Sequence, residues 1–377
     1  MPQALIALLL GGFAALLGGM SSASSSDDDD DDGSAAPGGP DQDGDGSDTG
    51  DSGGSSAVPD GPVPDGAPAP ELSGDTQGLA WDGPSAEEQL IVELINRARM
   101  DPAAEVARLD EPLASGISPS PAEPLAVTPE LGAASRAHSQ DMDDRDFFRH
   151  TNLDGQSPGD RALDEGHGTR FVGENIGWIG SGSLPSDTQP RTEAHHQHLW
   201  DSDGHQRNLM DDRWSEIGVG YDEGSYDGWN GSTFVTQMFS DRGFSYLTGV
   251  VIEDGDGDDF YDIGEGLGGV QITARDGTDS FATETWASGG YSLALPRGTY
   301  EVLFEGGGLD APLTRTVTIR DENVKLDVVE DRGVVTLASH APEPAPEAGA
   351  VLDFLPVVPM EDLPDDEDDA ETDLLLA

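Results

Sequence analysis

Three polar residues in the middle of the chain stand in unusual places in the sequence. His150 follows two phenylalanines and an arginine, Glu174 stands in a Gly-Glu-Asn segment that we expect to turn, and His205 lies beyond a tryptophan. Two neutral imidazoles can ligate Zn²⁺ or a similar ion and leave coordination positions open for water. A carboxylate beside them could orient that water or fix the tautomer of one histidine. If the fold brings these residues together, they predict a weak and exchangeable metal site.

The same residues allow two other interpretations. In the first, His150 and Glu174 hydrogen-bond to each other and only tie two loops together. In the second, the set is catalytic, but no nucleophile is arranged with its own base, because the sequence has no Gly-x-Ser-x-Gly turn and no cysteine. The sequence also lacks a phosphate-binding loop and a dinucleotide-binding glycine pattern. We therefore favour binding, with a metal-dependent hydrolase as the alternative.

A second group of acidic residues has the spacing of a calcium-binding loop. Acidic side chains occupy loop positions 1, 3, 5, 9 and 12, which are Asp254, Asp256, Asp258, Asp262 and Glu265. An EF-hand loop supplies oxygen ligands from these positions. Position 6, which is glycine in an EF-hand, is Asp259 here, and no helix is expected on either side. Because so many carboxylates repel one another without a cation, we predict bound Ca²⁺. A solvated acidic turn is the alternative.

Three further histidines lie close together at His195, His196 and His198. His195 and His198 would share one face of a helix that we expect over 192–201, and such a pair could hold a metal. The His-Glu-x-x-His pattern of zinc proteases is missing, however, so we expect surface histidines. His138, in contrast, is expected to be a packed or half-buried residue of its own helix.

The charge of the chain restricts its partners. Its 377 residues include 75 acids and only 18 Lys or Arg, which gives a formal net charge of −57. Residues 1–80 and 341–377 contain no Lys or Arg at all. A protein of this charge is not expected to bind nucleic acid by neutralising phosphates, or to dock to an anionic membrane.

The two ends of the chain differ in composition from its middle. Residues 1–22 contain an apolar run at 4–17, which is short for a membrane span but typical of a signal peptide. Residues 23–80 and 336–377 are rich in acids and in Gly, Ser or Pro, which predicts a disordered acidic linker and a disordered acidic tail. We therefore expect a secreted or extracellular protein, periplasmic or at the cell surface, with no stable membrane span.

Residues 81–243 contain signals for helices and then for strands. Ser85 and Glu88 have the spacing of a capping box, and Asp101-Pro102 both ends that helix and starts another. A further helix opens at Thr128-Pro129. Two strands are expected later, in EIGVGY and TFVTQMF. Helices followed by antiparallel strands predict an α+β domain.

Residues 244–335 have a different pattern. Five short apolar runs, GVVIE, VQITA, YSLAL, YEVLF and RTVTI, are separated by turns of Gly, Pro and Asp. This spacing of strands and turns, without helical periodicity, predicts a second domain that is a β-sandwich.

Segments of the first domain resemble, in order and spacing, the CAP superfamily of cysteine-rich secretory proteins, antigen 5 and plant pathogenesis-related proteins. The matching segments are LINRARMDPAAE, AASRAHSQDM, FFRHTNLDGQSPGDRA, FVGENIGW, GHQRNLM, EIGVGY and TFVTQMF. The chain is similar to the cysteine-free, SCP-like bacterial branch. The resemblance implies an α-β-α sandwich with a three-stranded antiparallel sheet and a surface cleft. It also implies that His150, Glu174 and His205 line the cleft, with Asp203 nearest to the position of the family's second acid.

The β domain also resembles known modules. Its acidic loop, together with GLGGVQITA and ASGGYSLALPRGTYEV, is similar to B-type repeats of bacterial surface proteins and to carboxypeptidase-regulatory-like domains. These are Ig-like modules, which implies a calcium-stiffened spacer. Together the resemblances imply a secreted, non-enzymatic binding module. Its cleft would take a zinc-like metal at His150 and His205, a small apolar or lipid-like ligand, or a surface protein. The alternatives are the metal-dependent hydrolase and a structural adhesion or matrix protein.

Overall fold

The computed structural model of the chain describes residues 81–180, 187–330 and 332–338. The predicted signal peptide at 1–22, the linker at 23–80 and most of the tail at 336–377 lie outside the described residues. Below, "first domain" means residues 81–243 and "β domain" means residues 244–338.

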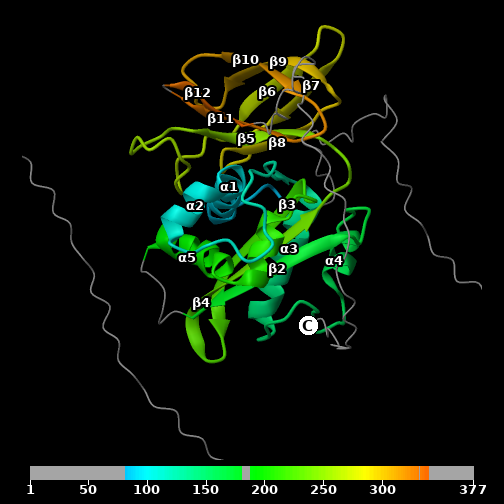
Figure 1. The fold of residues 1–377 in the computed structure, drawn as a ribbon, viewed down its shortest axis with the longest axis vertical. Helices are drawn as coiled ribbons and strands as arrows, with labels where there is room; N and C mark the ends of the chain where they lie inside the picture. Colours follow the sequence, from blue (N-terminus) through cyan, green and yellow to red (C-terminus); the bar gives the residue numbers. More distant parts are fainter. Residues whose placement is uncertain (1–80, 181–186, 331, 339–377) are drawn as a thin grey trace, which may run out of the picture. The chain divides into compact units, whose positions relative to one another are not determined.

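The described part of the first domain contains six helices (Figure 1): α1 Ala86–Met100, α2 Pro102–Leu109, α3 Pro129–Asp144, α4 Pro158–Asp164, α5 Thr188–Trp200 and α6 Asp203–Met210. The capping box at the start of α1 is confirmed, because Ser85 Oγ accepts from the Glu88 N–H and the Ser85 N–H donates to Glu88 Oε2 at 2.8 Å. Asp101 follows α1 and caps α2, as expected. We did not expect α4 and α6, because helices of seven and eight residues are too short to show a clear period.

Four strands form the sheet of the first domain: β1 Ala126–Val127, β2 Val172–Ile179, β3 Glu216–Tyr226 and β4 Trp229–Ser240. Their order is β1-β3-β4-β2, with β1 parallel to β3 and the other neighbours antiparallel. The sheet therefore has one strand more than the three expected, since a two-residue edge strand leaves no sequence pattern. The turn expected around Glu174 is also wrong, because Glu174 lies on β2.

Helices cover both faces of this sheet. On one face, Gly218 and Gly220 of β3 lie so close to α3 that a Cβ atom on either glycine would overlap the α3 backbone. On the other face, Gly177 of β2 lies against Leu199 of α5. Separate apolar clusters fill the two layers, one around Leu131 and Met238 and the other around Ile217. The result is the expected α-β-α sandwich, with β2 at an edge of the sheet.

The β domain consists of two four-stranded sheets, in the orders β10-β9-β6-β7 and β12-β11-β5-β8. Its strands are β5 Tyr246–Ile252, β6 Val270–Arg275, β7 Ser280–Glu284, β8 Gly290–Ala294, β9 Gly298–Gly306, β10 Leu313–Ile319, β11 Val324–Val329 and β12 Gly333–Ala338. One core joins residues from both sheets, so the β-sandwich is confirmed. Strands β7, β11 and β12 were not expected from the sequence. The relation to Ig-like modules stays a prediction.

The two domains share buried contacts along α1. Leu90 and Leu94 of α1 belong to one apolar cluster with Val250 of β5 and with Tyr261. Beside this cluster lies Lys325 of β11, which is 2% exposed and 2.7 Å from Glu93 of α1. The first domain and the β domain are therefore packed against each other through a core and a buried ion pair.

Candidate functional site

His150 and Glu174 are in direct contact. His150 Nδ1 lies 2.8 Å from Glu174 Oε1, and the Glu174 side chain is 2% exposed whereas that of His150 is 53% exposed. Because a carboxylate only accepts hydrogen bonds, Nδ1 of the neutral imidazole carries the proton. Nε2 then keeps its lone pair, on the more exposed member of the pair. This is the tautomer that a metal-binding histidine adopts when a carboxylate holds its other nitrogen.

Arg161 of α4 completes this contact, and our sequence reasoning did not single it out. Its Nη2 donates to Glu174 Oε2, and its Nη1 donates to the backbone carbonyl of His150 at 2.8 Å. Its side chain is only 7% exposed. One guanidinium therefore fixes both the carboxylate and the backbone of the histidine that the carboxylate orients. In the sequence, only the position of Arg161 within the CAP-like segment that begins with Phe147 could have pointed to this role.

His138 of α3 holds the residue before His150. It is fully buried, and its Nε2 lies 3.2 Å from the carbonyl oxygen of Arg149. Since a carbonyl can only accept, Nε2 carries the proton. Burial lowers the pKa of His138 to about 4, so the ring is neutral near pH 7. The prediction that His138 packs inside its helix layer is confirmed, but its support of the His150 loop was not foreseen.

His205 reaches the same region from the opposite layer of the sandwich. It lies on α6, which Asn175 of β2 holds by donating to the His205 carbonyl at 3.2 Å. Asn208 adds a bond from its Nδ2 to the carbonyl of Glu174 at 3.2 Å. Burial lowers the pKa of His205, and the charge of His150 lowers it further. The two imidazoles are therefore within electrostatic range of each other, on either side of the edge strand β2.

Asp203 stands apart from these three residues. Its side chain is 74% exposed, and it pairs with Arg207 at 3.6 Å. Within the ranges that the structure describes, no hydrogen bond or ion pair links Asp203 to His150, Glu174 or His205. It opens α6, a position that favours a carboxylate through the helix dipole.

The histidines of α5 differ from our expectation. His195 and His196 are buried rather than on the surface, and only His198 is exposed. His195 Nε2 lies 2.6 Å from Thr233 Oγ1, and His196 Nε2 lies 2.7 Å from Glu105 Oε1. The expectation of surface histidines was wrong because α5 is covered by α1 on one side and by the sheet on another. The spacing of apolar residues along α5 did not reveal this second contact.

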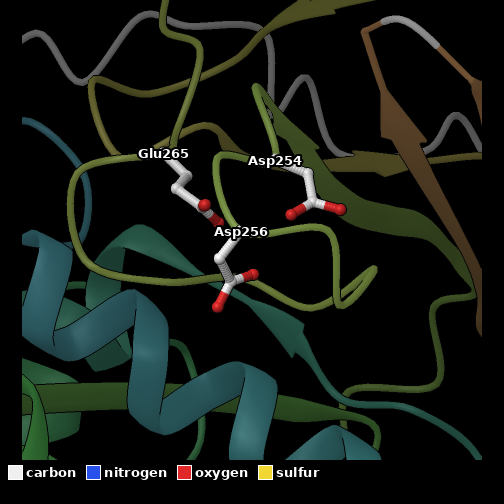
Figure 2. Close-up of side chains that lie close together, drawn as sticks. All are labelled: Asp254, Asp256 and Glu265. Carbon is white, nitrogen blue, oxygen red and sulfur yellow. The ribbon is translucent and has the colours of Figure 1, made fainter. Parts of the chain in front are cut away.

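The acidic loop of the β domain brings three of its five predicted ligands together (Figure 2). One carboxylate oxygen from each of Asp254, Asp256 and Glu265 lies within 4.8 Å of the others. Asp259, at position 6, has φ 63°. That is the left-handed conformation for which an EF-hand uses glycine, and aspartate adopts it more readily than most residues. Asp259 therefore adopts at position 6 the backbone conformation that glycine supplies in an EF-hand.

The other members of the acidic loop have different partners. Asp262 accepts from Gln189 Nε2 of α5 at 2.5 Å, and Asp258 accepts from the Phe260 N–H at 2.8 Å. Arg332 contacts the carboxylates of Asp254 and Asp259. The structure thus places Asp258 and Asp262 in the loop, but outside the group of three oxygens.

Comparison with known proteins identifies relatives of the first domain. Residues 92–239 match the model of a family described as CAP, the cysteine-rich secretory protein family. The chain is 29% identical over 157 residues to the protein from Bacillus subtilis strain 168 that is named "Uncharacterized protein YkwD". That match covers 42% of this chain and 51% of the relative, so the chain spans about half the length of the curated relative it matches.

Solved structures also resemble part of the chain. An extracellular protein of Bacillus anthracis that contains an SCP domain is 26% identical, with 41% of this chain and 40% of that chain covered and a TM-score of 0.28. An outer surface protein of Borrelia burgdorferi is 13% identical, with 41% and 93% covered and a TM-score of 0.29. Among the described residues, no helix is both long and apolar enough to cross a membrane.

Proposed function

We propose, from the premise that this chain contains a CAP domain, that it is an extracellular binding module whose His150–Glu174 site takes a divalent metal ion such as Zn²⁺. His150 Nε2 and a ring nitrogen of His205 would be the protein ligands, and water would complete the coordination. The contact between His150 Nδ1 and Glu174 Oε1 at 2.8 Å carries the proposal, because it presents Nε2 with a lone pair on a half-exposed side chain.

The surroundings of Glu174 favour binding over hydrolysis. Its two oxygens are engaged, one by His150 and the other by Arg161. A general base must reach the proton that it abstracts, and both oxygens of this carboxylate already accept hydrogen bonds from the protein. Glu174 is therefore suited to orient a ligand rather than to take a proton from water. The polar character of the group also favours a metal over the apolar ligand that the family resemblance allowed.

Calorimetric titration with Zn²⁺ tests this proposal. Replacement of His150 by alanine should remove measurable Zn²⁺ binding, because it deletes the ligand that Glu174 orients. Glu174→Gln should weaken binding about 10- to 100-fold, as expected for a residue that supports a metal ligand. The matched control is His198→Ala, which removes an exposed histidine of α5 and should bind as the wild type does. Equal Zn²⁺ affinity of the wild type and His150→Ala would rule the site out.

We further propose that the loop from Asp254 to Glu265 binds Ca²⁺ and thereby stabilises the β domain. The convergence of three carboxylates within 4.8 Å supports this proposal. So does the network around them, because the Gly257 N–H donates to Asp254 at 2.7 Å and the Gly255 N–H donates to Glu265 at 2.6 Å. These bonds hold the carboxylates in place before an ion arrives.

Thermal unfolding with and without Ca²⁺ tests the loop. A hundredfold excess of Ca²⁺ over its Kd should stabilise the protein by about 2.7 kcal/mol, a rise in Tm of roughly 5–10 °C. Asp254→Asn should abolish the rise, because it removes the carboxylate that both a cation and the loop backbone use. Asp310→Asn, in an exposed turn, is the control, and its Tm should rise with Ca²⁺ as that of the wild type does. A wild-type Tm that is the same in EDTA and in millimolar Ca²⁺ would contradict the proposal.

A further inference from the structure

A patch of aromatic side chains lies at the β3–β4 hairpin, and the proposed metal site does not use it. Tyr226 is at its centre, with ring centroids 5.0 Å from Trp178 and 6.4 Å from Phe148. Trp229 pairs with Tyr226 across the hairpin. Trp229 is 51% exposed and Phe148 is 36% exposed. We call Phe148, Trp178, Tyr226 and Trp229 the aromatic patch.

Five aspartates lie in the β3–β4 hairpin or at the end of α3 beside it: Asp143, Asp144, Asp146, Asp222 and Asp227. Hydrogen bonds tie two of them to the hairpin backbone, because the Asp227 N–H donates to Asp146 Oδ1 at 3.1 Å and the Ser225 N–H donates to Asp143 Oδ1 at 2.6 Å. Asp222 lies next to Phe234 in the β3–β4 ladder, and the Phe234 ring contacts Tyr226. Asp143, Asp146 and Asp227 therefore lie at the same hairpin as Tyr226 and Trp229, and Asp222 lies on its strand β3.

The negative charge of this surface is not neutralised within the described part of the chain. No Lys, Arg or His there forms an ion pair with any of the five aspartates. The nearest bases along the sequence are engaged elsewhere: Arg145 pairs with Asp141 and Asp154, and Arg149 lies over the Phe147 ring, 5.8 Å from its centroid.

Two features show that this crowding of charge is unfavourable without a partner. The last turn of α3 contains acids and no base, although the carbonyl end of a helix favours cations. In addition, burial and the charges of Asp143 and Asp144 raise the pKa of Asp222 to about 6. A cation at this surface would relieve both effects.

We propose that the aromatic patch and its aspartates form a docking surface for an Arg- or Lys-rich segment of another protein. Guanidinium and ammonium groups are attracted to the faces of aromatic rings, and exposed tryptophan and tyrosine often dominate the binding energy of an interface. The chain does not supply this segment from its own ends, because residues 1–80 and 341–377 contain no Lys or Arg. A second copy is also unsuitable, since two chains of net charge −57 repel each other.

Calorimetric titration of the full chain with the peptide Gly-Arg-Gly-Arg-Gly tests the proposal at physiological ionic strength. The same peptide with citrulline in place of arginine has a similar shape without the charge. We expect binding of the arginine peptide only. Trp229→Ala should weaken it about five- to tenfold, by removing the most exposed ring. Phe171→Ala is the matched control, because Phe171 is 53% exposed but lies elsewhere, under Arg213.

A charge-matched pair of double variants separates this surface from general attraction to an acidic protein. Asp146→Asn with Asp227→Asn should weaken binding, whereas Glu301→Gln with Glu305→Gln, on an exposed part of β9, should not. The variants change surface residues, and circular dichroism would verify their folds. Three results would each overturn the proposal. They are an equal loss of affinity for the arginine peptide in both double variants, equal binding of the citrulline peptide, and an unchanged affinity of Trp229→Ala for the arginine peptide. The zinc titration is independent of all three results.

Discussion

At the scale of single residues, the exposed histidine of the candidate metal site depends on side chains that are buried. His138 holds the carbonyl of Arg149, and Arg161 holds both the carbonyl of His150 and the carboxylate of Glu174. The Glu174 carboxylate that is held in this way accepts from His150 Nδ1 and so fixes the tautomer of the ring. Hydrogen bonds thus decide that Nε2 carries the lone pair, on a side chain that is 53% exposed.

The buried His138 should make the protein sensitive to acid. Its pKa is about 4 in the folded protein and about 6.5 when unfolded, so the unfolded chain binds its proton first as pH falls. His138 therefore does not reduce the free energy of unfolding above about pH 6.5, and it reduces it progressively as the pH falls from about 6.5 to about 4. At about 1.4 kcal/mol per pKa unit, the loss is about 3 kcal/mol.

The variant His138→Gln isolates this effect, because glutamine does not titrate and the other buried histidines remain. Urea unfolding of the wild type and the variant at pH 7 and pH 4 gives the comparison. We expect His138→Gln to be less stable at pH 7 and to lose less stability on acidification. An identical loss for both proteins would show that His138 is not held neutral by the fold.

At the scale of elements, the edge strand β2 determines where the site forms. Successive residues of a strand face opposite layers, so Glu174 faces the α3–α4 layer while Asn175 faces α6. His150 comes from the first of these layers and His205, on α6, from the second, so they lie on either side of β2, within electrostatic range of each other. The distance between the layers is in turn set by close packing of α3 on β3, where the glycines Gly218 and Gly220 allow backbone contact.

Replacement of Gly220 by alanine should therefore destabilise the domain. The added Cβ atom would overlap the backbone of α3 at Ser135, and overpacking of this kind typically costs about 1–3 kcal/mol or more. Gly204→Ala is the control, since Gly204 lies in α6 with no atom within 4 Å of the new Cβ position, and alanine should gain about 0.5–1 kcal/mol there. Chemical denaturation of both variants would measure the difference. A stable Gly220→Ala protein would mean that α3 can move away from the sheet at little cost.

At the scale of the whole molecule, the described parts of the two domains are joined by buried polar groups as well as by a core. Lys325, the only lysine of the chain, is buried between Glu93 of α1 and Asp327 of β11. Burial alone would lower the pKa of Lys325, but Asp327 and Glu93 outweigh it and raise the pKa. On the other side of the junction, Asn323 donates to the carbonyl of Pro124 at 2.8 Å. Lys325 and Asn323 therefore place buried, paired polar groups of the β domain against the first domain.

Lys325→Ala should cost about 3–5 kcal/mol, because it leaves two carboxylates buried without their cation. Arg275→Ala, at an exposed position of β6, should change stability by less than about 0.5 kcal/mol. Scanning calorimetry of the wild type should show one transition for both domains, since they share a core. Two well-separated transitions, or a Lys325→Ala variant as stable as the control, would contradict a tight junction.

The sequence by itself determined the features that depend on neighbours along the chain. Ser85 with Glu88, and Asp101 with Pro102, predicted helix ends, because capping is a local interaction. The spacing of acids in the loop from Asp254 likewise predicted carboxylates that converge, as those of Asp254, Asp256 and Glu265 do, and the family resemblance implied that His150 and Glu174 lie in one cleft. Each of these conclusions needed only residues a few positions apart or a known order of motifs.

Tertiary structure alone decided the features that depend on distant segments. Arg161 and His138 came to support the His150–Glu174 contact because α3 and α4 fold over the same strand, and no local pattern marks such a role. His195 and His196 became buried because α1 and the sheet cover α5 from two directions. A sequence period reports one apolar face of a helix, but it does not say how many neighbours will enclose that helix.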